Sequence, residues 1–318
     1  MLLIMKVQGI PSLSLNAFRA GGASKQDFIR DLGQAYQEIG FVAVRDHGID
    51  ALLLQDFYES VASFFSLSTE QKKAYQSGKG GQRGYTSFGE EHAKGNSYKD
   101  LKEFWHFGRQ LDPTHPLYKV YPPNIVVQEL PRFNTLGMQV YQEMDHLGRT
   151  LLQAIALFLE LEWDYFEDKV QNGNSILRAI HYPPIMQDPG MSIRAGAHED
   201  INLITLLAGS SAEGLQVLTQ KGEWVEITHI DGHIVVNVGD MLQRLTNNVL
   251  SSTTHRVVNP PQNTRHKPRY SMPFFLHPGS EMDLSCLPSC VTEERPCAYE
   301  PITAGEYLEQ RLREIGLL

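Results

Sequence analysis

Apolar positions in the first half of the chain recur at the spacing of amphipathic helices. One run begins at Ser24 and ends at Gly40, where glycine can close a helix in the left-handed conformation. Similar apolar stripes predict helices over 50–65 and 128–161, the second interrupted near Pro131. The short run FVAV, directly after Gly40, predicts a strand.

The pattern of apolar and polar residues changes after Ser175. Short apolar runs follow one another with turn residues between them: ILRAIHY, INLITLL, LQVLT, WVEITHI, HIVVNVG, HRVVN and YSMPFFL. Closely spaced strands of this kind predict an antiparallel sandwich or barrel rather than alternating strands and helices. Residues 303–315 return to a helical pattern. We therefore expect mixed α and β structure in which helices flank a β-rich core.

Residues 77–100 are rich in glycine and polar side chains, which predicts a long loop. Within it, Arg83 could contact an anionic substrate, and Tyr85 and Phe88 could offer a stacking surface. A solvated loop without a function explains the same composition, so both interpretations stay open.

The net charge and the cysteine count limit the classes of partner that the chain is expected to bind. The chain has 318 residues, with 28 Lys and Arg against 37 Asp and Glu, a net charge of −9 and a pI near 5.7. An acidic protein is a poor match for nucleic acid or for anionic membranes, and no apolar run is long enough to span a bilayer. The three cysteines, Cys286, Cys290 and Cys297, are an odd number, which favours reduced thiols and a cytoplasmic location. The sequence leaves their role and the oligomeric state open.

His198 and Asp200 stand before the apolar run INLITLL. In a strand, residues two apart project from the same face, so this pair could offer two neighbouring ligands to a divalent metal. A site built of two histidines and one carboxylate needs a third residue. A second His-x-Asp pair, His229 and Asp231, lies over an Asp-Gly turn signal, where solvent-facing polar residues are expected.

Further candidates follow downstream. His255 begins one apolar run, and Arg269 and Ser271 begin the next, again two residues apart. A guanidinium and a hydroxyl on one face of a strand make a good receptor for a carboxylate. Taken alone, each of these residues is more simply explained by a structural role than by ligand binding.

The order of these motifs resembles the iron(II)- and 2-oxoglutarate-dependent oxygenase superfamily and, within it, the isopenicillin N synthase-like group. The resemblance covers most of the chain. It includes IGFVAVRDHGI near the N-terminus, HYPP at 181–184, VNVGD at 236–240 and THRVVNP around His255.

The resemblance implies a single oxygenase domain over 1–318. A mainly helical region over 1–174 would precede a double-stranded β-helix, or jelly roll, over 175–280 that carries the metal site, and an extension with a helix would follow over 281–318. Fe(II) would be held by His198, Asp200 and His255. The cosubstrate 2-oxoglutarate would be held by Arg269, Ser271 and Tyr182.

The same resemblance implies a dioxygenase that uses O2 to hydroxylate, desaturate or cyclise a small organic molecule and releases succinate and CO2. Arg83, Tyr85 and Phe275 are the candidate substrate contacts. The sequence names neither the primary substrate nor the outcome of the reaction.

Two departures leave alternatives open. Glu199 stands between the metal-ligand candidates where many members have Thr, and Ile180 stands where many have Asn. The segments HEDINLIT and LTNN are similar to oxidases of the group that use O2 without 2-oxoglutarate and bind a substrate carboxylate with Arg-x-Ser. A non-catalytic binding protein on the same scaffold is the alternative of another class.

Overall fold

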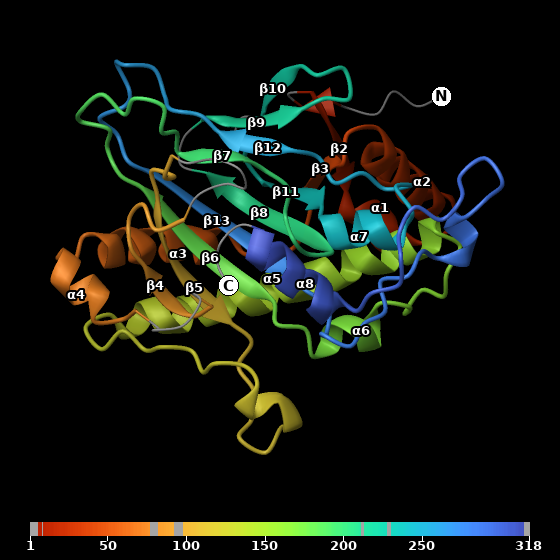
Figure 1. The fold of residues 1–318 in the computed structure, drawn as a ribbon, viewed down its shortest axis with the longest axis horizontal. Helices are drawn as coiled ribbons and strands as arrows, with labels where there is room; N and C mark the ends of the chain where they lie inside the picture. Colours follow the sequence, from red (N-terminus) through yellow and green to blue (C-terminus); the bar gives the residue numbers. More distant parts are fainter. Residues whose placement is uncertain are drawn as a thin grey trace.

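The computed structural model describes residues 6–7, 9–76, 82–91, 98–210, 213–227 and 230–314. Two β-sheets enclose one apolar cluster, and the longer helices pack on the outer face of the larger sheet (Figure 1). The fold is mixed α and β with a double-stranded β-helix at its centre and helices on its flanks, so the predicted fold class is confirmed.

The larger sheet has nine strands among the described residues. Its order is β1 (Lys6–Val7), β2 (Ile10–Ser14), β3 (Phe41–Arg45), β11 (His233–Val238), β8 (Ile204–Ser210), β13 (Arg269–Leu276), β6 (Ile176–Tyr182), β5 (Glu103–Gly108) and β4 (Gly84–Thr86). Only the β2–β3 pair is parallel in the described registers.

The smaller sheet lies across the larger one and has four described strands. Their order is β10 (Trp224–Ile227), β9 (Leu215–Leu218), β12 (His255–Val257) and β7 (Ala195–His198). Apolar side chains of both sheets meet between them, including Phe41, Ile180, Val217 and Val257. The candidate site lies next to this apolar interior.

Helices are distributed unevenly along the chain. They are α1 (Leu15–Ala20), α2 (Gly22–Glu38), α3 (Ala51–Phe65), α4 (Thr69–Lys73), α5 (Pro131–Phe158), α6 (Glu167–Gln171), α7 (Asp240–Leu245) and α8 (Ala304–Glu314), with short 3-10 turns at Pro116–Lys119 and Pro288–Cys290. No helix in the described part of the chain combines the length and the apolar character that a membrane span requires.

The predicted helices exist, with shifted starts. α2 begins at Gly22, before Ser24, and ends where predicted, because Gly40 takes a positive φ of 73° and its N–H bonds back to Ala35. α5 begins at Pro131 itself, since proline is tolerated in the first turn of a helix.

The N-terminal region holds more strands than the sequence indicated. Five strands before residue 110, β1 to β5, belong to the larger sheet, and only β3 was predicted. β4 lies inside the segment predicted as a loop; the rest of that segment, at 77–81 and 92–97, lies outside the described residues. β5 was missed because all six of its residues are buried, so it shows no alternation of polar and apolar positions. The division of the chain near residue 174 stays a prediction.

A close contact joins α2 to α5. A Cβ atom at Gly33 would lie 2.0 Å from the Phe158 ring, so the ring occupies the space that only glycine leaves. Both helices pack into the cluster that covers the larger sheet. Their approach therefore depends on a residue with no side chain.

We expect Gly33→Ala to lower the free energy of unfolding by about 1–3 kcal/mol, because the methyl group forces Phe158 out of place. In an unhindered helix the same change is stabilising, so the sign of the effect is diagnostic. Urea unfolding followed by circular dichroism measures it, with the exposed neighbour Gln34→Ala as the control. A Gly33→Ala protein as stable as the control would contradict this contact.

Candidate metal and carboxylate site

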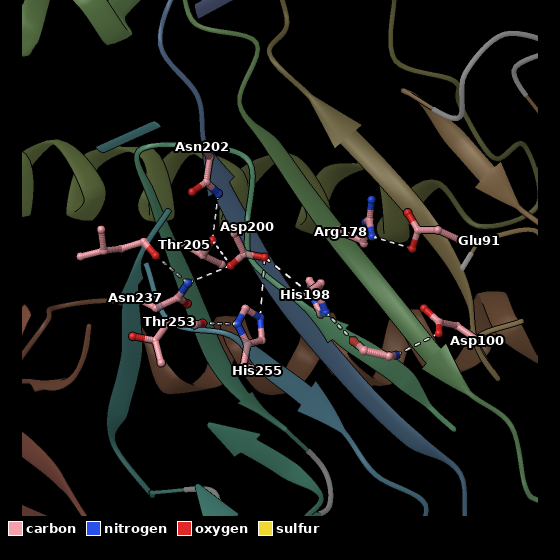
Figure 2. A network of polar contacts seen from close by, with 12 residues as sticks. Glu91, Asp100, Arg178, His198, Asp200, Asn202, Thr205, Asn237, Thr253 and His255 are labelled. Carbon is pink, nitrogen blue, oxygen red and sulfur yellow. Dashed lines mark hydrogen bonds and ion pairs between the residues drawn. The ribbon is translucent and has the colours of Figure 1, made fainter. Parts of the chain in front are cut away.

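The pairing of β7 with β12 brings two histidines together. In this antiparallel pair His198 lies directly opposite His255, and their ring centroids are 4.4 Å apart. Both rings point toward Asp200 (Figure 2). Residues far apart in the sequence thus meet because of one strand register.

Asp200 completes the group, but not for the predicted reason. β7 ends at His198, so Asp200 lies in the turn before β8 rather than two residues along a strand. Its Oδ1 is 3.8 Å from His198 Nε2 and 3.7 Å from His255 Nε2. Ligand atoms of the three residues all lie within 4.8 Å of one another, a spacing at which one divalent ion fits between them.

Two donors fix the Asp200 carboxylate. Thr205 Oγ1 donates to its Oδ2 at 2.6 Å and Asn237 Nδ2 donates to the same oxygen at 2.8 Å. Asn202 donates in turn to the Thr205 hydroxyl. Because Oδ2 is engaged by these donors, Oδ1 is the oxygen left facing the two imidazoles (Figure 2).

Backbone carbonyls set the tautomer of both histidines. His198 Nδ1 lies 2.7 Å from the Gly196 carbonyl oxygen, and His255 Nδ1 lies 3.1 Å from that of Thr253. A carbonyl only accepts, so each Nδ1 carries the proton and each Nε2 presents its lone pair to the site.

The surroundings of His198 and Asp200 favour the protonation states that metal binding requires. It lowers the pKa of His198 to about 4, with the neighbouring His255 as the second cause, so His198 is neutral at physiological pH. Burial alone would raise the pKa of Asp200, but the two imidazoles and the two donors outweigh it and hold that pKa below its ordinary value. A carboxylate with two imidazoles is the donor set that suits a divalent transition metal.

The three residues predicted to receive a carboxylate lie on two paired strands. Arg269 and Ser271 on β13 are 1% and 4% exposed, and β13 pairs with β6 so that Arg269 lies opposite Tyr182. The Arg269 guanidinium carbon is 4.9 Å from the centre of the Tyr182 ring. A buried guanidinium beside a hydroxyl and a phenol is a suitable receptor for an anion.

A cavity of about 700 Å³ opens beside the metal-ligand candidates. His198, Asp200 and the predicted substrate contact Phe275 belong to its wall, and residues of α8 such as Leu308 also line it. The guanidinium carbon of Arg178, also in the wall, is 5.2 Å from the centre of the Phe275 ring.

Charged residues of this wall are paired. Lys102 contacts Glu91 at 2.6 Å and Asp100 at 2.9 Å, and Arg178 contacts Glu91 at 3.3 Å. Asp100 also accepts from the backbone N–H of Gly196, the residue whose carbonyl holds His198 (Figure 2). Two cations against two carboxylates leave this part of the wall with no net charge.

Arg83 and Tyr85 do not line the cavity as predicted. The Tyr85 ring, 3% exposed, packs against Phe64 in the core, and its hydroxyl donates to Glu103. Arg83 is fully buried against the backbone of Gly108 and donates to Asn174, which does line the cavity. Tyr85 belongs to the apolar cluster between the sheet and the helices, and Arg83 supports the cavity through Asn174.

Sequence reasoning missed several residues of the site. Thr205 and Asn237 are polar residues inside otherwise apolar strands, and this is the signal that could have found them. Arg178 gave the same signal within ILRAIHY. His229 lies outside the described residues.

Two family models match the chain. Residues 10–129 match the N-terminal region described for the non-haem dioxygenase in morphine synthesis, and residues 173–278 match the 2OG-Fe(II) oxygenase superfamily. The two matches span the N-terminal region and the β-helix that carries the site.

Proteins similar to this chain include enzymes and solved structures. A putative 2OG-Fe(II) oxygenase family protein from Caulobacter crescentus is 45% identical, with 97% of this chain and 100% of that one covered and a TM-score of 0.88. A full-length Neurospora crassa protein, solved in complex with alpha-KG and thymine, is 30% identical over 96% of both chains, with a TM-score of 0.84. Kihadalactone A synthase LFS of Citrus sinensis is 33% identical over 90% of this chain and 87% of its own.

We expect Thr205→Val to weaken binding of a divalent metal about tenfold or more, because loss of the donor frees the Asp200 carboxylate to rotate. Anaerobic titration with Co(II), followed by its visible absorption, measures this without turnover. Thr150→Val on α5, which also loses one hydroxyl hydrogen bond, is the control. Equal affinities in the two variants would show that Thr205 does not orient the carboxylate.

Proposed function

Because this chain belongs to the 2OG-Fe(II) oxygenase superfamily, an Fe(II)- and 2-oxoglutarate-dependent family of dioxygenases, we propose that His198, Asp200 and His255 hold its iron. The observation that carries the proposal is the convergence of two imidazole Nε2 atoms and one oriented carboxylate oxygen. Three protein ligands leave positions open for a bidentate oxoacid and for O2.

Arg269, Ser271 and Tyr182 hold the distal carboxylate of 2-oxoglutarate in this proposal. Their burial supports it, since a guanidinium that is 1% exposed beside a hydroxyl and a phenol favours an anionic ligand. When bound, iron and 2-oxoglutarate supply O2 activation, with succinate and CO2 as the co-products. The chain's own part is to orient the cosubstrate and to exclude water with the apolar side chains between the two sheets.

The substrate is a small organic molecule bound in the 700 Å³ cavity. Phe275 offers it a ring face, and Arg178 offers a donor, because Nε and Nη1 are engaged by His106 and Glu91 while Nη2 meets no acceptor among the described residues. Around Arg178 the wall carries no net charge, which favours an uncharged molecule with a carbonyl-type acceptor. The thymine complex of the similar Neurospora crassa protein supports this size and chemistry.

Hydroxylation is the outcome we propose for this substrate, and a cytoplasmic location remains our proposal from the three unpaired cysteines. Relatives named as 2-oxoglutarate-dependent weigh against an oxidase that uses O2 alone. A non-catalytic binding protein would have no use for open metal positions.

We expect the purified protein to convert 2-oxoglutarate slowly to succinate with Fe(II) and O2, even without a primary substrate. His255→Ala should reduce this rate at least about a hundredfold, the upper end of what losing a ligand's supporting partner costs. His146→Ala, an exposed histidine on α5, is the matched control. O2 uptake without succinate would identify the oxidase instead, and a fully active His255→Ala would remove that residue from the metal site.

We expect Arg178→Lys to raise the KM of a stimulating substrate about tenfold, because lysine keeps the charge but loses the planar donor edge. A panel of uncharged carbonyl-bearing ring compounds that includes thymine is assayed for stimulation of succinate formation. Arg132→Lys, on the exposed surface, is the control. An unchanged KM for every stimulating compound would exclude Arg178 from substrate binding.

A further inference from the structure

Arg194 is a buried arginine with almost no partners. It directly precedes β7, the strand that ends at His198, and it is 1% exposed. Its Nη2 donates to the Lys267 carbonyl at 3.2 Å, whereas Nε and Nη1 meet no acceptor in the described part of the chain. A guanidinium has five N–H donors, and burying them unsatisfied is costly.

Three other buried or partly buried cations differ from Arg194, whereas the fully buried Arg83 donates to the Gln82 carbonyl and the Asn174 side chain. Lys72 contacts Glu103 at 2.9 Å, Lys102 contacts two carboxylates, and the partly buried Arg109 contacts Asp145 at 2.9 Å. No ion pair joins Arg194 to an acidic side chain among the described residues. The fold therefore neutralises buried charge at these other positions and leaves it in place at Arg194.

A second guanidinium lies near the same tyrosine ring as Arg194. The guanidinium carbons of Arg194 and Arg269 are 5.9 and 4.9 Å from the centre of the same Tyr182 ring. Both side chains are 1% exposed. Burial first, and the charge of Arg269 second, lower the pKa of Arg194 to about 10, so Arg194 remains a cation at neutral pH.

Two like charges in one buried pocket repel each other and lose their hydration. An anion between them reduces both penalties, because each guanidinium then donates charge-assisted hydrogen bonds to it. The single bond from Arg194 to the Lys267 carbonyl uses one donor of five and leaves the charge unbalanced. If Arg194 served only to link the Lys267 loop to β7, one hydrogen bond would have to offset the desolvation of a whole guanidinium.

We propose that Arg194 is a second binding residue for the distal carboxylate of 2-oxoglutarate, acting together with Arg269 and Tyr182. This inference rests on the proposed function, since it assumes that the cosubstrate occupies the Arg269 site. It adds selectivity: two guanidiniums around one carboxylate favour an oxoacid that carries a second carboxylate over one that lacks it.

The test compares two oxoacids under anaerobic conditions. The Fe(II)-loaded protein is titrated with 2-oxoglutarate and with 2-oxopentanoate, which has the same chelating end but no distal carboxylate, and the visible charge-transfer band of the chelate gives each Kd. Arg194→Gln and Arg194→Lys are compared with Arg149→Gln, a largely buried arginine on α5 that pairs with acidic residues.

Arg194→Gln should weaken 2-oxoglutarate about tenfold to a hundredfold and leave 2-oxopentanoate unchanged, as expected for loss of charge-assisted bonds. Arg194→Lys should fall between wild type and Arg194→Gln. Equal weakening of both oxoacids, or no weakening, would assign Arg194 to structure and overturn the inference. A wild-type protein that binds iron but shows no band with either oxoacid would contradict the proposed function itself, and this inference with it.

Discussion

The register between β7 and β12 determines whether the site exists at all. It sets His198 opposite His255, and a shift by one residue would turn one imidazole to the other face of the sheet. The remaining ligand candidate, Asp200, depends on the same pairing, because it follows soon after the last residue of β7. Backbone carbonyls at Gly196 and Thr253 then orient the two rings. The chemistry of the site is thus a consequence of strand pairing and of hydrogen bonds made by the strands themselves.

Side chains alternate between the two faces of the larger sheet, so residues that pack against the helices and residues near the candidate site lie on opposite faces. On β13, Arg269, Ser271 and Phe275 are on the inner face, while Met272 and Phe274 pack toward the helices. β6 repeats the pattern, and it places Arg178 and Tyr182 on the inner side. Polar groups therefore gather inside the β-helix, and the sheet is anchored from outside by α5 and its neighbours (Figure 1). This arrangement lets a rigid apolar layer hold charged side chains in a buried environment.

Motif order in the sequence was enough to find the metal-ligand candidates and the Arg-x-Ser pair. Strand alternation correctly placed Arg269 and Ser271 together, but it gave the wrong reason for Asp200, which reaches the site from a turn. Tyr85 was misjudged because glycine-rich surroundings suggested a loop, whereas pairing with β5 buries it. Partners such as Thr205 and Arg194 depend on which strands become neighbours, and local sequence patterns do not encode that.

Iron-edge anomalous diffraction from anaerobic crystals soaked in Fe(II) would locate the metal relative to His198, Asp200 and His255. We expect one strong peak bounded by His198 Nε2, Asp200 Oδ1 and His255 Nε2, with Asp200 Oδ2 still bonded to Thr205 and Asn237. A peak at other ligands, or none between these three residues in iron-soaked crystals, would contradict the assignment of this site as the metal centre.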